Sequence, residues 1–181
     1  MKRLVLLLGL LALVPCTARA QRFQVFGGYS YFRFDPGAGP KGNLNGWEFS
    51  GTYKTNRWVG LTADFSGHYG SSFGPSTSLH TYLFGPQISL PLPFFSLYVH
   101  ALAGAAHIHN GVLASAPEPG VLVLTGDASD TTFAAALGGG LDTKIAPLVS
   151  FRVVQVDYLA TRFGGSTQNH LRVSTGLVIR F

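Results

Sequence analysis

Apolar and polar residues alternate along most of the chain after residue 20, with the period of two that places successive side chains on opposite faces of a β-strand. In the last segment, Leu177 and Ile179 fall on one side, Arg172 and Arg180 fall on the other, and only Val178 departs from the pattern. The alternation predicts eight strands, at residues 23–33, 45–54, 57–67, 78–89, 95–107, 131–142, 149–161 and 169–181.

An even number of alternating strands can form a closed antiparallel sheet, which leaves no unpaired edge for lipid to solvate. We therefore predict an all-β fold, an eight-stranded antiparallel up-and-down transmembrane β-barrel, in a single domain over residues 21–181. In such barrels the periplasmic turns are short and the external loops are longer. With a periplasmic N-terminus, the external loops are expected at residues 34–44, 68–77, 108–130 and 162–168.

The same alternation assigns side chains to a lipid face and a lumen face. Lys54 points into the lumen, and the strands at 95–107 and 131–142 are less decisive because they are rich in Ala and Gly. The glycines at 138–140 are interpreted as a bend that leaves room for large lumen side chains, because they lack the helix and Lys of a phosphate-binding loop. A polar lumen network is expected from Glu48, Asp64, Gln87, His100, Asp157 and Arg172.

The connection between the last two strands predicts one contact in this network. If it is centred on residues 164–165, antiparallel pairing sets Asp157 directly across from Arg172. The alternative is that each of the two contacts lumen water or another partner. Arg152 conflicts with the alternation, because it shares a face with Val154. Either Arg152 lies at the membrane interface with its charge in water, or a β-bulge shifts the register.

The N-terminus has the pattern of a cleaved export signal. Two basic residues precede an apolar run over residues 4–14, and Ala18-Arg19-Ala20 offers the small residues that signal peptidase reads. We expect residues 1–20, including the only cysteine, to leave the mature chain. A lipid anchor on Cys16 is the alternative, which is disfavoured because Pro15 stands where lipoprotein signals carry a small residue.

Composition narrows the class of protein. Charged residues make up only 12% of the chain, while no apolar run after the export signal reaches the ~20 residues of a transmembrane helix. High apolarity without such a run favours apolar residues distributed by alternation. Removing three of the 13 basic residues with the signal lowers the formal charge from +5 to +2. No basic patch for nucleic acid remains, so we expect no nucleic-acid partner.

Two groups of polar residues suggest catalysis or metal binding. Asp64, Ser66 and His68 share one face, but neighbours at this spacing stand about 6.6 Å apart along a strand, and a nucleophile and its base need about 2.6–3.2 Å. Lumen filling is therefore favoured over a hydrolase triad.

His107 and His109 can supply two ligands to a metal ion, but the pattern offers no third ligand. We therefore favour the interpretation that they are solvated histidines at the rim of the barrel. Neither a metal nor a cofactor is predicted.

Five segments resemble the small outer membrane protein β-barrel domain family, which is related in plan to the OmpA transmembrane domain and is often labelled porin-like. The likeness covers essentially all of residues 22–181 and implies an integral protein of the bacterial outer membrane, in contact with outer-membrane lipid. The wall-binding domain of full OmpA is not expected, because the chain stops at its eighth strand. The segments are Phe26-Gly-Gly-Tyr-Ser-Tyr-Phe32, Leu44-Asn-Gly-Trp-Glu48, His80-Thr-Tyr-Leu-Phe-Gly-Pro86, Leu137-Gly-Gly-Gly-Leu-Asp142 and Thr161-Arg-Phe-Gly-Gly-Ser-Thr-Gln-Asn169.

The chain also ends as bacterial outer-membrane barrels do, with an alternating last strand that closes on an aromatic residue. This resemblance implies that Leu177, Ile179 and Phe181 form an assembly signal. The partner that reads such a signal is the outer-membrane barrel assembly machinery.

Eight strands enclose a lumen that side chains can just fill, whereas an aqueous porin channel needs 16–18 strands. We therefore expect a monomeric outer-membrane barrel that is not an enzyme, with a side-chain-filled lumen and a structural or surface-interaction role. Two alternatives stay open. One is a small-solute pore or ligand-holding barrel, and the other is a barrel-type outer-membrane lipid hydrolase that uses Ser66 or His68.

Overall fold

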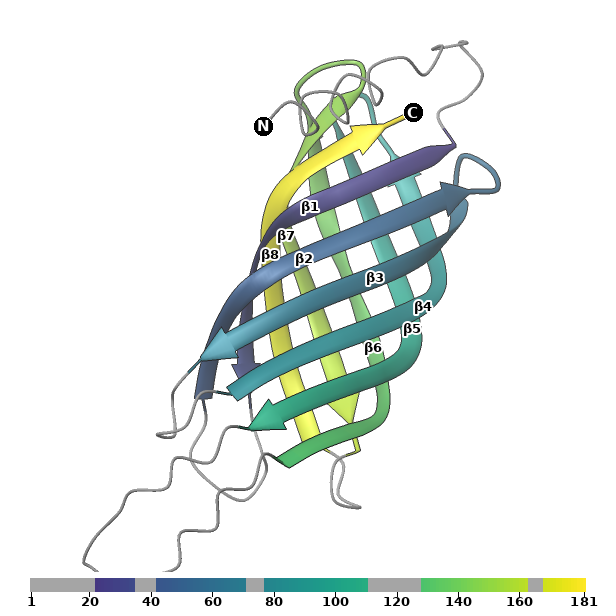
Figure 1. Cartoon of the computed structure of the whole chain (residues 1–181). Coiled ribbons are helices and arrows are strands. Elements are labelled where there is room, and N and C mark those ends of the chain that lie inside the picture. The colour runs from purple at the N-terminus through teal and green to yellow at the C-terminus, as the bar shows by residue number, and fades with distance from the viewer. Residues whose placement is uncertain (1–21, 35–41, 71–76, 111–127, 163–167) are drawn as a thin grey trace, which may run out of the picture.

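Eight antiparallel strands form one closed barrel, in which each strand pairs with its neighbours along the chain and β1 pairs with β8 (Figure 1). The computed structural model describes residues 22–34, 42–70, 77–110, 128–162 and 168–181, so the predicted export signal lies outside the described residues. The predicted fold class is confirmed, and all eight predicted strands are present. They are β1 (Phe23–Phe34), β2 (Gly42–Lys54), β3 (Val59–Gly70), β4 (Thr77–Pro91), β5 (Phe95–Asn110), β6 (Ala128–Lys144), β7 (Val149–Thr161) and β8 (Gln168–Arg180).

In the described parts of the chain, no helix has the length and apolarity that a membrane span needs.

The two ends of the barrel differ in their connections. Short turns, such as those at residues 55–58 and 145–148, join strands at one end, where Phe23 and Phe181 also pair through their backbones (Figure 1). The strand ends that are separated by longer stretches of sequence lie at the opposite end of the barrel. In barrels of this type short turns are periplasmic. We therefore refer to the end with the short turns as the periplasmic end and to the other as the external end.

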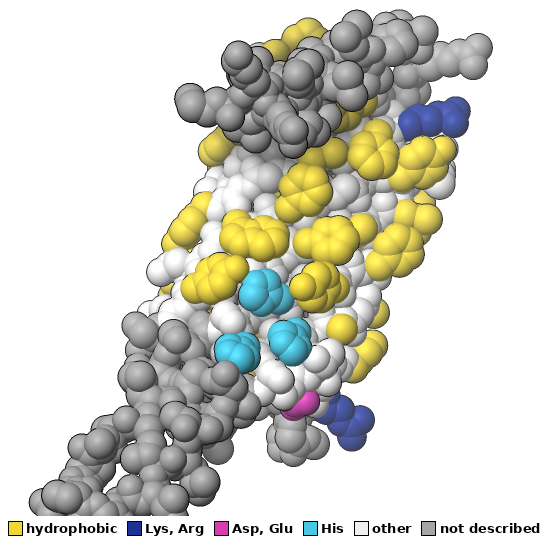
Figure 2. Space-filling model, in the orientation of Figure 1, with side chains coloured by type: hydrophobic (Ala, Val, Ile, Leu, Met, Phe, Trp, Pro, Cys, Tyr) yellow, Lys and Arg dark blue, Asp and Glu magenta, His cyan; other side chains and the backbone are white. Residues whose placement is uncertain are grey.

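The predicted lipid and lumen faces are confirmed in the strands that alternate clearly. In β2, Trp47 and Phe49 are exposed on the outer face, while Glu48 and Ser50 are buried in the lumen. Hydrophobic side chains cover much of the visible outer surface of the barrel (Figure 2). Closure of the sheet therefore buries the polar residues and leaves the apolar ones outside, which is the arrangement that a membrane requires.

β5 and β6, in which the sequence pattern did not clearly separate a lipid face from a lumen face, are the longest strands. β5 and β6 pair continuously from Phe95 opposite Thr143 to Asn110 opposite Ala128. Pairing therefore extends into the segment 108–130, which the sequence predicted to be entirely loop. The prediction of this boundary is wrong because backbone hydrogen bonds continue where the apolar alternation weakens.

A β-bulge in β7 resolves the conflict at Arg152. Asp142 pairs with Arg152, but the preceding Leu141 pairs with Val154, so Val153 is one extra residue in the strand. Val153 and Val154 are 45% and 37% exposed, whereas Arg152 is 2% exposed and lies in the lumen. Of the two alternatives, the shifted register is confirmed and the interfacial position of Arg152 is wrong. The bulge lets two consecutive valines face lipid and returns the polar residues to the lumen.

The lumen has an apolar part near the external end. Phe32 lies near the external end of β1, and Leu79 lies near the external end of β4. Both are fully buried. The cluster to which they belong, which we call the apolar plug, consists of Phe32, Leu44, Leu79, Leu83, Leu102, Ala106, Ala134, Ala136 and Leu159. The sequence did not predict this cluster, because apolar residues on both faces of a strand hide the alternation.

Candidate functional site

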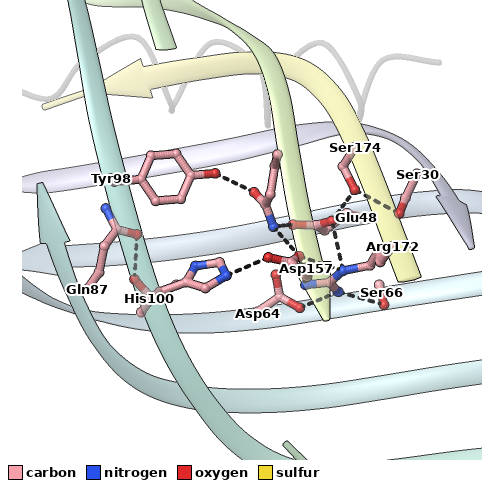
Figure 3. A network of polar contacts seen from close by, with 12 residues as sticks. Ser30, Glu48, Asp64, Ser66, Gln87, Tyr98, His100, Asp157, Arg172 and Ser174 are labelled. Atoms are coloured by element: carbon pink, nitrogen blue, oxygen red, sulfur yellow. Dashed lines mark hydrogen bonds and ion pairs between the residues drawn. The ribbon is translucent and has the colours of Figure 1, made fainter. Parts of the chain in front are cut away.

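Arg172 of β8 lies at the centre of a buried ion group in the lumen (Figure 3). Its Nη2 and Nε donate to Oδ2 of Asp157, at 2.7 and 2.9 Å, and its Nη1 donates to Oδ1 of Asp64 at 2.8 Å. A carboxylate oxygen of Glu48 lies 3.4 Å from Nε. One guanidinium thus contacts carboxylates from β2, β3 and β7. We call these four residues the central ion group.

The register of the last hairpin explains one of these contacts. Asp157 and Arg172 are direct partners in the pairing of β7 with β8, which confirms the predicted register. The other two carboxylates reach Arg172 across the lumen, since Glu48 and Asp64 belong to β2 and β3. A narrow barrel brings such residues together because its opposite walls are within reach of long side chains.

Other side chains bind most of the remaining oxygens of the central ion group, while Oδ2 of Asp64 has no hydrogen-bond partner among the described residues. Gln155 donates from Nε2 to Oε1 of Glu48 and to Oδ2 of Asp157, both at 2.7 Å, and it accepts a 2.6 Å hydrogen bond from the Tyr98 hydroxyl. His100 Nε2 lies 2.7 Å from the second oxygen of Asp157. Most of the polar atoms in this region therefore have partners, as the burial of charge requires.

A second ion group lies between the first and the periplasmic end. Arg152 donates from Nε to Oδ1 of Asp142 at 2.8 Å, and Nη2 of Arg180 lies 3.3 Å from the other oxygen of Asp142. The guanidinium of Arg152 also stands over the rings of Phe26 and Tyr98, 4.2 and 4.4 Å from their centroids. We call Asp142, Arg152 and Arg180 the periplasmic ion group. Stacking on two aromatic faces compensates part of the cost of burying this cation.

The two ion groups differ in the balance of charge. The central group has Arg172 against three carboxylic acids, and the periplasmic group has two arginines against Asp142. Gln155 joins them, because its Oε1 also accepts a 2.6 Å hydrogen bond from Arg152. An acidic excess next to a basic excess allows the two groups to stabilise each other. Together the two groups place three arginines in contact with four carboxylic acids inside the barrel.

All six side chains predicted for the lumen network lie in the lumen: Glu48, Asp64, Gln87, His100, Asp157 and Arg172. Gln87 takes no part in the central group and bonds instead to Thr62 and Ser89, at 3.0 and 3.1 Å. Sequence reasoning missed Tyr98 and the periplasmic ion group. Asp142 and Tyr98 lie on the strands with weak alternation, and the bulge hid Arg152, so no clear signal was available for them.

Gly138 and Gly140 make room for lumen side chains, as predicted, whereas a Cβ on Gly139 would meet the backbone oxygen of Tyr98 and the outward-facing Val99. A Cβ on Gly138 would overlap Oδ1 of Asp157, and one on Gly140 would lie 2.6 Å from the backbone oxygen of Val154 and 2.7 Å from the Tyr98 hydroxyl. Both side chains belong to the hydrogen-bonded network just described. The glycines therefore permit the network at a point where any larger residue would displace it.

The residues of the possible hydrolase triad do not contact one another as a triad requires. Asp64 and Ser66 both bind Arg172, with Ser66 Oγ 3.2 Å from Nη1. His68 Nε2 instead lies 2.9 Å from Oγ of Ser30. The three residues are buried in the lumen. They fill the lumen with polar groups, although Oδ2 of Asp64 and Nδ1 of His68 have no hydrogen-bond partner among the described residues. Ser66 and His68 do not form a nucleophile and base pair.

The two histidines of the possible metal site stand on the outer face of β5. His107 Nδ1 lies 2.7 Å from Oγ1 of Thr131, and His109 is exposed. Within the described ranges, no group of three or more His, Cys, Asp or Glu side chains is arranged to hold a metal ion. The third ligand that a metal site needs is thus not supplied by the described strands.

The predicted assembly signal lies at the periplasmic end of the outer face. Leu177, Ile179 and Phe181 are all exposed there. The backbone of Phe181 pairs with that of Phe23, with a 2.8 Å bond from the Phe181 N–H to the Phe23 carbonyl. The last residue thus completes the seam between β1 and β8. Recognition of these three side chains by assembly machinery stays a prediction.

A closed eight-stranded barrel with an apolar outer face and an ionic lumen defines an integral membrane β-barrel. Residues 4–181 match the family described as outer membrane protein beta-barrel domain, and the chain belongs to that family. It is therefore an integral protein of the bacterial outer membrane, as the resemblance implied. A comparison with curated proteins found no match.

Solved outer-membrane barrels share the fold. Neisserial surface protein A is 11% identical, with a TM-score of 0.65 over 88% of this chain and 97% of that one. Ail, the attachment invasion locus protein of Yersinia pestis, is 15% identical, with a TM-score of 0.58 over 87% and 97% of the two chains. The N-terminal barrel domain of Pseudomonas aeruginosa OprF is 12% identical, with a TM-score of 0.53 over 90% and 100%. At these identities the likeness shows the fold alone.

Proposed function

We propose that this protein is a closed, non-catalytic scaffold of the outer membrane, with a structural or surface-interaction role carried by its external connections. The observation that carries the proposal is the central ion group, in which Arg172 ties together carboxylates from three other strands. The charged side chains of this group contact one another across the lumen. They are therefore not arranged to attract and release a passing solute.

The apolar plug supports the same conclusion. A solute entering from the external end would meet Phe32 and Leu79 before it reached the ions, and both side chains are fully buried. An ion moving through an apolar constriction would lose its hydration without gaining partners. The plug and the ion groups thus oppose conduction by different means, which disfavours the small-solute pore.

The lipid hydrolase is also disfavoured. Ser66 and His68 bind other partners, and both are buried inside the barrel, away from the lipid that they would have to cleave. A hydrolase of lipids would need its nucleophile open to the membrane and beside its base. We therefore infer that the protein is not an enzyme.

Two solved structures support a surface role. One is named a surface protein and the other an attachment invasion locus protein. In a barrel with a closed lumen, the external connections are the parts most free to contact partners outside the cell. We propose that adhesion is carried there, that the barrel acts as a monomer in outer-membrane lipid, and that the barrel assembly machinery inserts it.

The test combines conductance with adhesion. The mature protein, reconstituted in planar bilayers, is expected to give no ion channels, and a variant in which residues 111–127 are replaced by a short Gly-Ser turn should be equally silent. Cells that display the wild-type protein should adhere to immobilised heparin or cultured epithelial cells more strongly than cells that display the shortened variant. Reproducible channels from the wild type would contradict the closed scaffold, and equal adhesion would contradict the role of that connection.

Lipid analysis after overexpression provides the enzymatic control. The lipid A and phospholipid profiles should match those of cells that express a Ser66→Ala variant. A new deacylated lipid that depends on Ser66 would show that the barrel is a hydrolase.

The proposed insertion by the barrel assembly machinery has its own test. Deletion of Phe181 or the change Ile179→Asp should reduce the folded fraction, which is the fraction whose mobility on a gel changes on heating.

A further inference from the structure

A patch of polar rings interrupts the apolar outer face near the external end of the barrel. Three of the six histidines lie there, on β4 and β5, and Figure 2 shows them together beside hydrophobic side chains. His80 and His107 are direct partners in the pairing of these two strands. His109 is the next residue of β5 on the same face. The other three histidines are buried in the lumen.

Neighbouring side chains hold two of these rings in place. The hydroxyl of Tyr69 lies 3.1 Å from Nε2 of His80, and the two rings pack edge to face with centroids 5.6 Å apart. Thr131 holds His107 through a 2.7 Å contact with Nδ1. Each contact engages one nitrogen of an imidazole that has two. The second nitrogen of each ring can therefore donate to another group without breaking the contact.

A permanent cation adjoins the patch. Arg162 follows β7, and its backbone N–H bonds to the carbonyl of Phe133. Phe133 lies two residues from Thr131 on the same face of β6, so Arg162 and the histidines border one area of the outer surface. We call His80, His107, His109 and Arg162 the external basic patch.

One exposed acid lies near the patch, but none of the described acids contacts its histidines. Four of the five acids in the described strands are buried in the lumen. The fifth, Asp130, is exposed at the external end of β6 and pairs with Ile108, and Figure 2 shows an acidic side chain beyond the histidines. The three imidazoles therefore keep hydrogen-bonding groups that no described carboxylate occupies. Such a surface complements an anion with several oxygens, such as a phosphate.

An apolar hollow lies next to the patch, toward the middle of the barrel. Its floor is made by Ala101, Ala103 and Ala135, and Phe84, Leu137 and Tyr158 stand around it. Its volume is about 370 Å³. Phe84 and Leu137 are 58% and 66% exposed, so they form raised walls beside the alanines. The hollow follows β5, because Ala103 pairs with Phe84 on one side and Ala135 on the other.

The patch and the hollow lie in line along one strand. His107 and Ala103 share the outer face of β5 and are four residues apart, which is about 13 Å along a strand. Basic groups near the external membrane boundary, followed by an apolar groove in the membrane interior, match the two parts of an amphiphile. We propose that this face binds one acyl lipid with an anionic phosphate headgroup, with the phosphate on the external basic patch and one acyl chain in the hollow.

The shape of the hollow favours a lipid over a second copy of the barrel. A flat protein surface would rest on the raised side chains of Phe84 and Leu137 and would not reach the alanines between them. A flexible acyl chain can fill such a narrow space. A free phosphate ion would use the patch but not the hollow, so the two sources of phosphate can be distinguished by experiment.

Native mass spectrometry of the whole mature barrel, released from detergent micelles, tests the proposal. The probes are phosphatidic acid, diacylglycerol with the same chains, and inorganic phosphate. The wild type is expected to retain one phosphatidic acid with an affinity about tenfold or more above that for diacylglycerol. Inorganic phosphate at equal concentration should not displace it. Equal retention of the two lipids would overturn the proposal.

Two variants separate the headgroup from the chain. The triple variant His80→Gln, His107→Gln, Arg162→Gln should lose the preference for phosphatidic acid, and Ala103→Phe, which fills the hollow, should weaken the retention of both lipids. Val25→Phe and Arg33→Gln make similar changes on the outer face of β1 and should leave retention unchanged. Heat-modifiable mobility on a gel identifies the variants that fold. Folded variants that bind like the wild type, or controls that lose the lipid equally, would overturn the proposed site.

Discussion

The external and periplasmic parts of the lumen are filled by different chemistry within one barrel. The apolar plug consists of aliphatic side chains and Phe32, while the region below it contains three arginines and four carboxylic acids in contact. Both regions are buried. Both fill the lumen with side chains, but they depend on different properties of those side chains.

The apolar plug and the ion groups differ in the substitutions that each can accept. Apolar packing depends on volume and shape, so one aliphatic residue can replace another of similar size. An ion network depends on each partner, because a buried charge that loses its partner keeps the cost of desolvation. We therefore expect the plug to respond to the size of a side chain and the ion groups to respond to its charge.

The largest effect is expected when Arg172 is removed. The change Arg172→Met leaves three carboxylic acids of the central ion group without their shared cation. It should lower the free energy of unfolding by about 3–5 kcal/mol, as measured by urea unfolding in lipid vesicles with tryptophan fluorescence. Asp157→Asn alone and together with Arg172→Met completes a double-mutant cycle. Additive losses would mean that the two side chains do not stabilise each other.

A change of volume in the plug should have an effect of similar or smaller size. Leu79→Ala leaves a cavity among fully buried side chains and should cost about 2–5 kcal/mol, whereas Leu79→Met should cost less than about 1.5 kcal/mol. Asp157→Asn also conserves volume but removes a charge that contacts Arg172. If it is tolerated as well as Leu79→Met in the same unfolding assay, the proposed contrast between the two regions is wrong.

A smaller effect is expected from the glycines that face the ion groups. Gly140→Ala places a methyl group 2.6 Å from the backbone oxygen of Val154 and 2.7 Å from the Tyr98 hydroxyl. It should destabilise the barrel by about 1–3 kcal/mol, because the β7 backbone must shift and Tyr98 must move away from Gln155. Gly51→Ala is the matched control, since its nearest neighbour would be a ring atom of Phe23 at 3.8 Å. Equal midpoints of urea unfolding for the two variants would show that Gly140 is not needed for space.

The smallest effect is expected from a single neutral hydrogen bond. Tyr98→Phe removes the 2.6 Å bond to Gln155 but keeps the ring beneath Arg152. Gln155 Oε1 still accepts from Arg152, so it is not left without a partner. The loss should be about 0.5–1.5 kcal/mol in the same assay. A loss as large as that of Arg172→Met would mean that the neutral bonds, and not the ion pairs, determine the stability of the lumen.

The local pattern was enough to predict the strands, their two faces and one register. Alternation is a property of neighbouring residues, so it identified Glu48 and Asp64 as lumen residues without any knowledge of what they contact. The centre of the connection between two antiparallel strands also fixes their pairing, and this is why Asp157 could be placed opposite Arg172. The bulge at Val153 was one of two alternatives that the pattern left open, because an extra residue is recognised only when the next strand is in place.

The tertiary structure alone decided what meets across the lumen. Glu48 and Asp64 reach Arg172 only because the sheet closes with a particular tilt and stagger, which no single strand encodes. The same closure gathers Asp142, Arg152 and Arg180 from three strands and brings the leucines of the plug together at the external end. A polar lumen and an apolar surface could be predicted from the residues alone, because both depend on the period of two. The partners inside the lumen depend on the shape of the closed barrel.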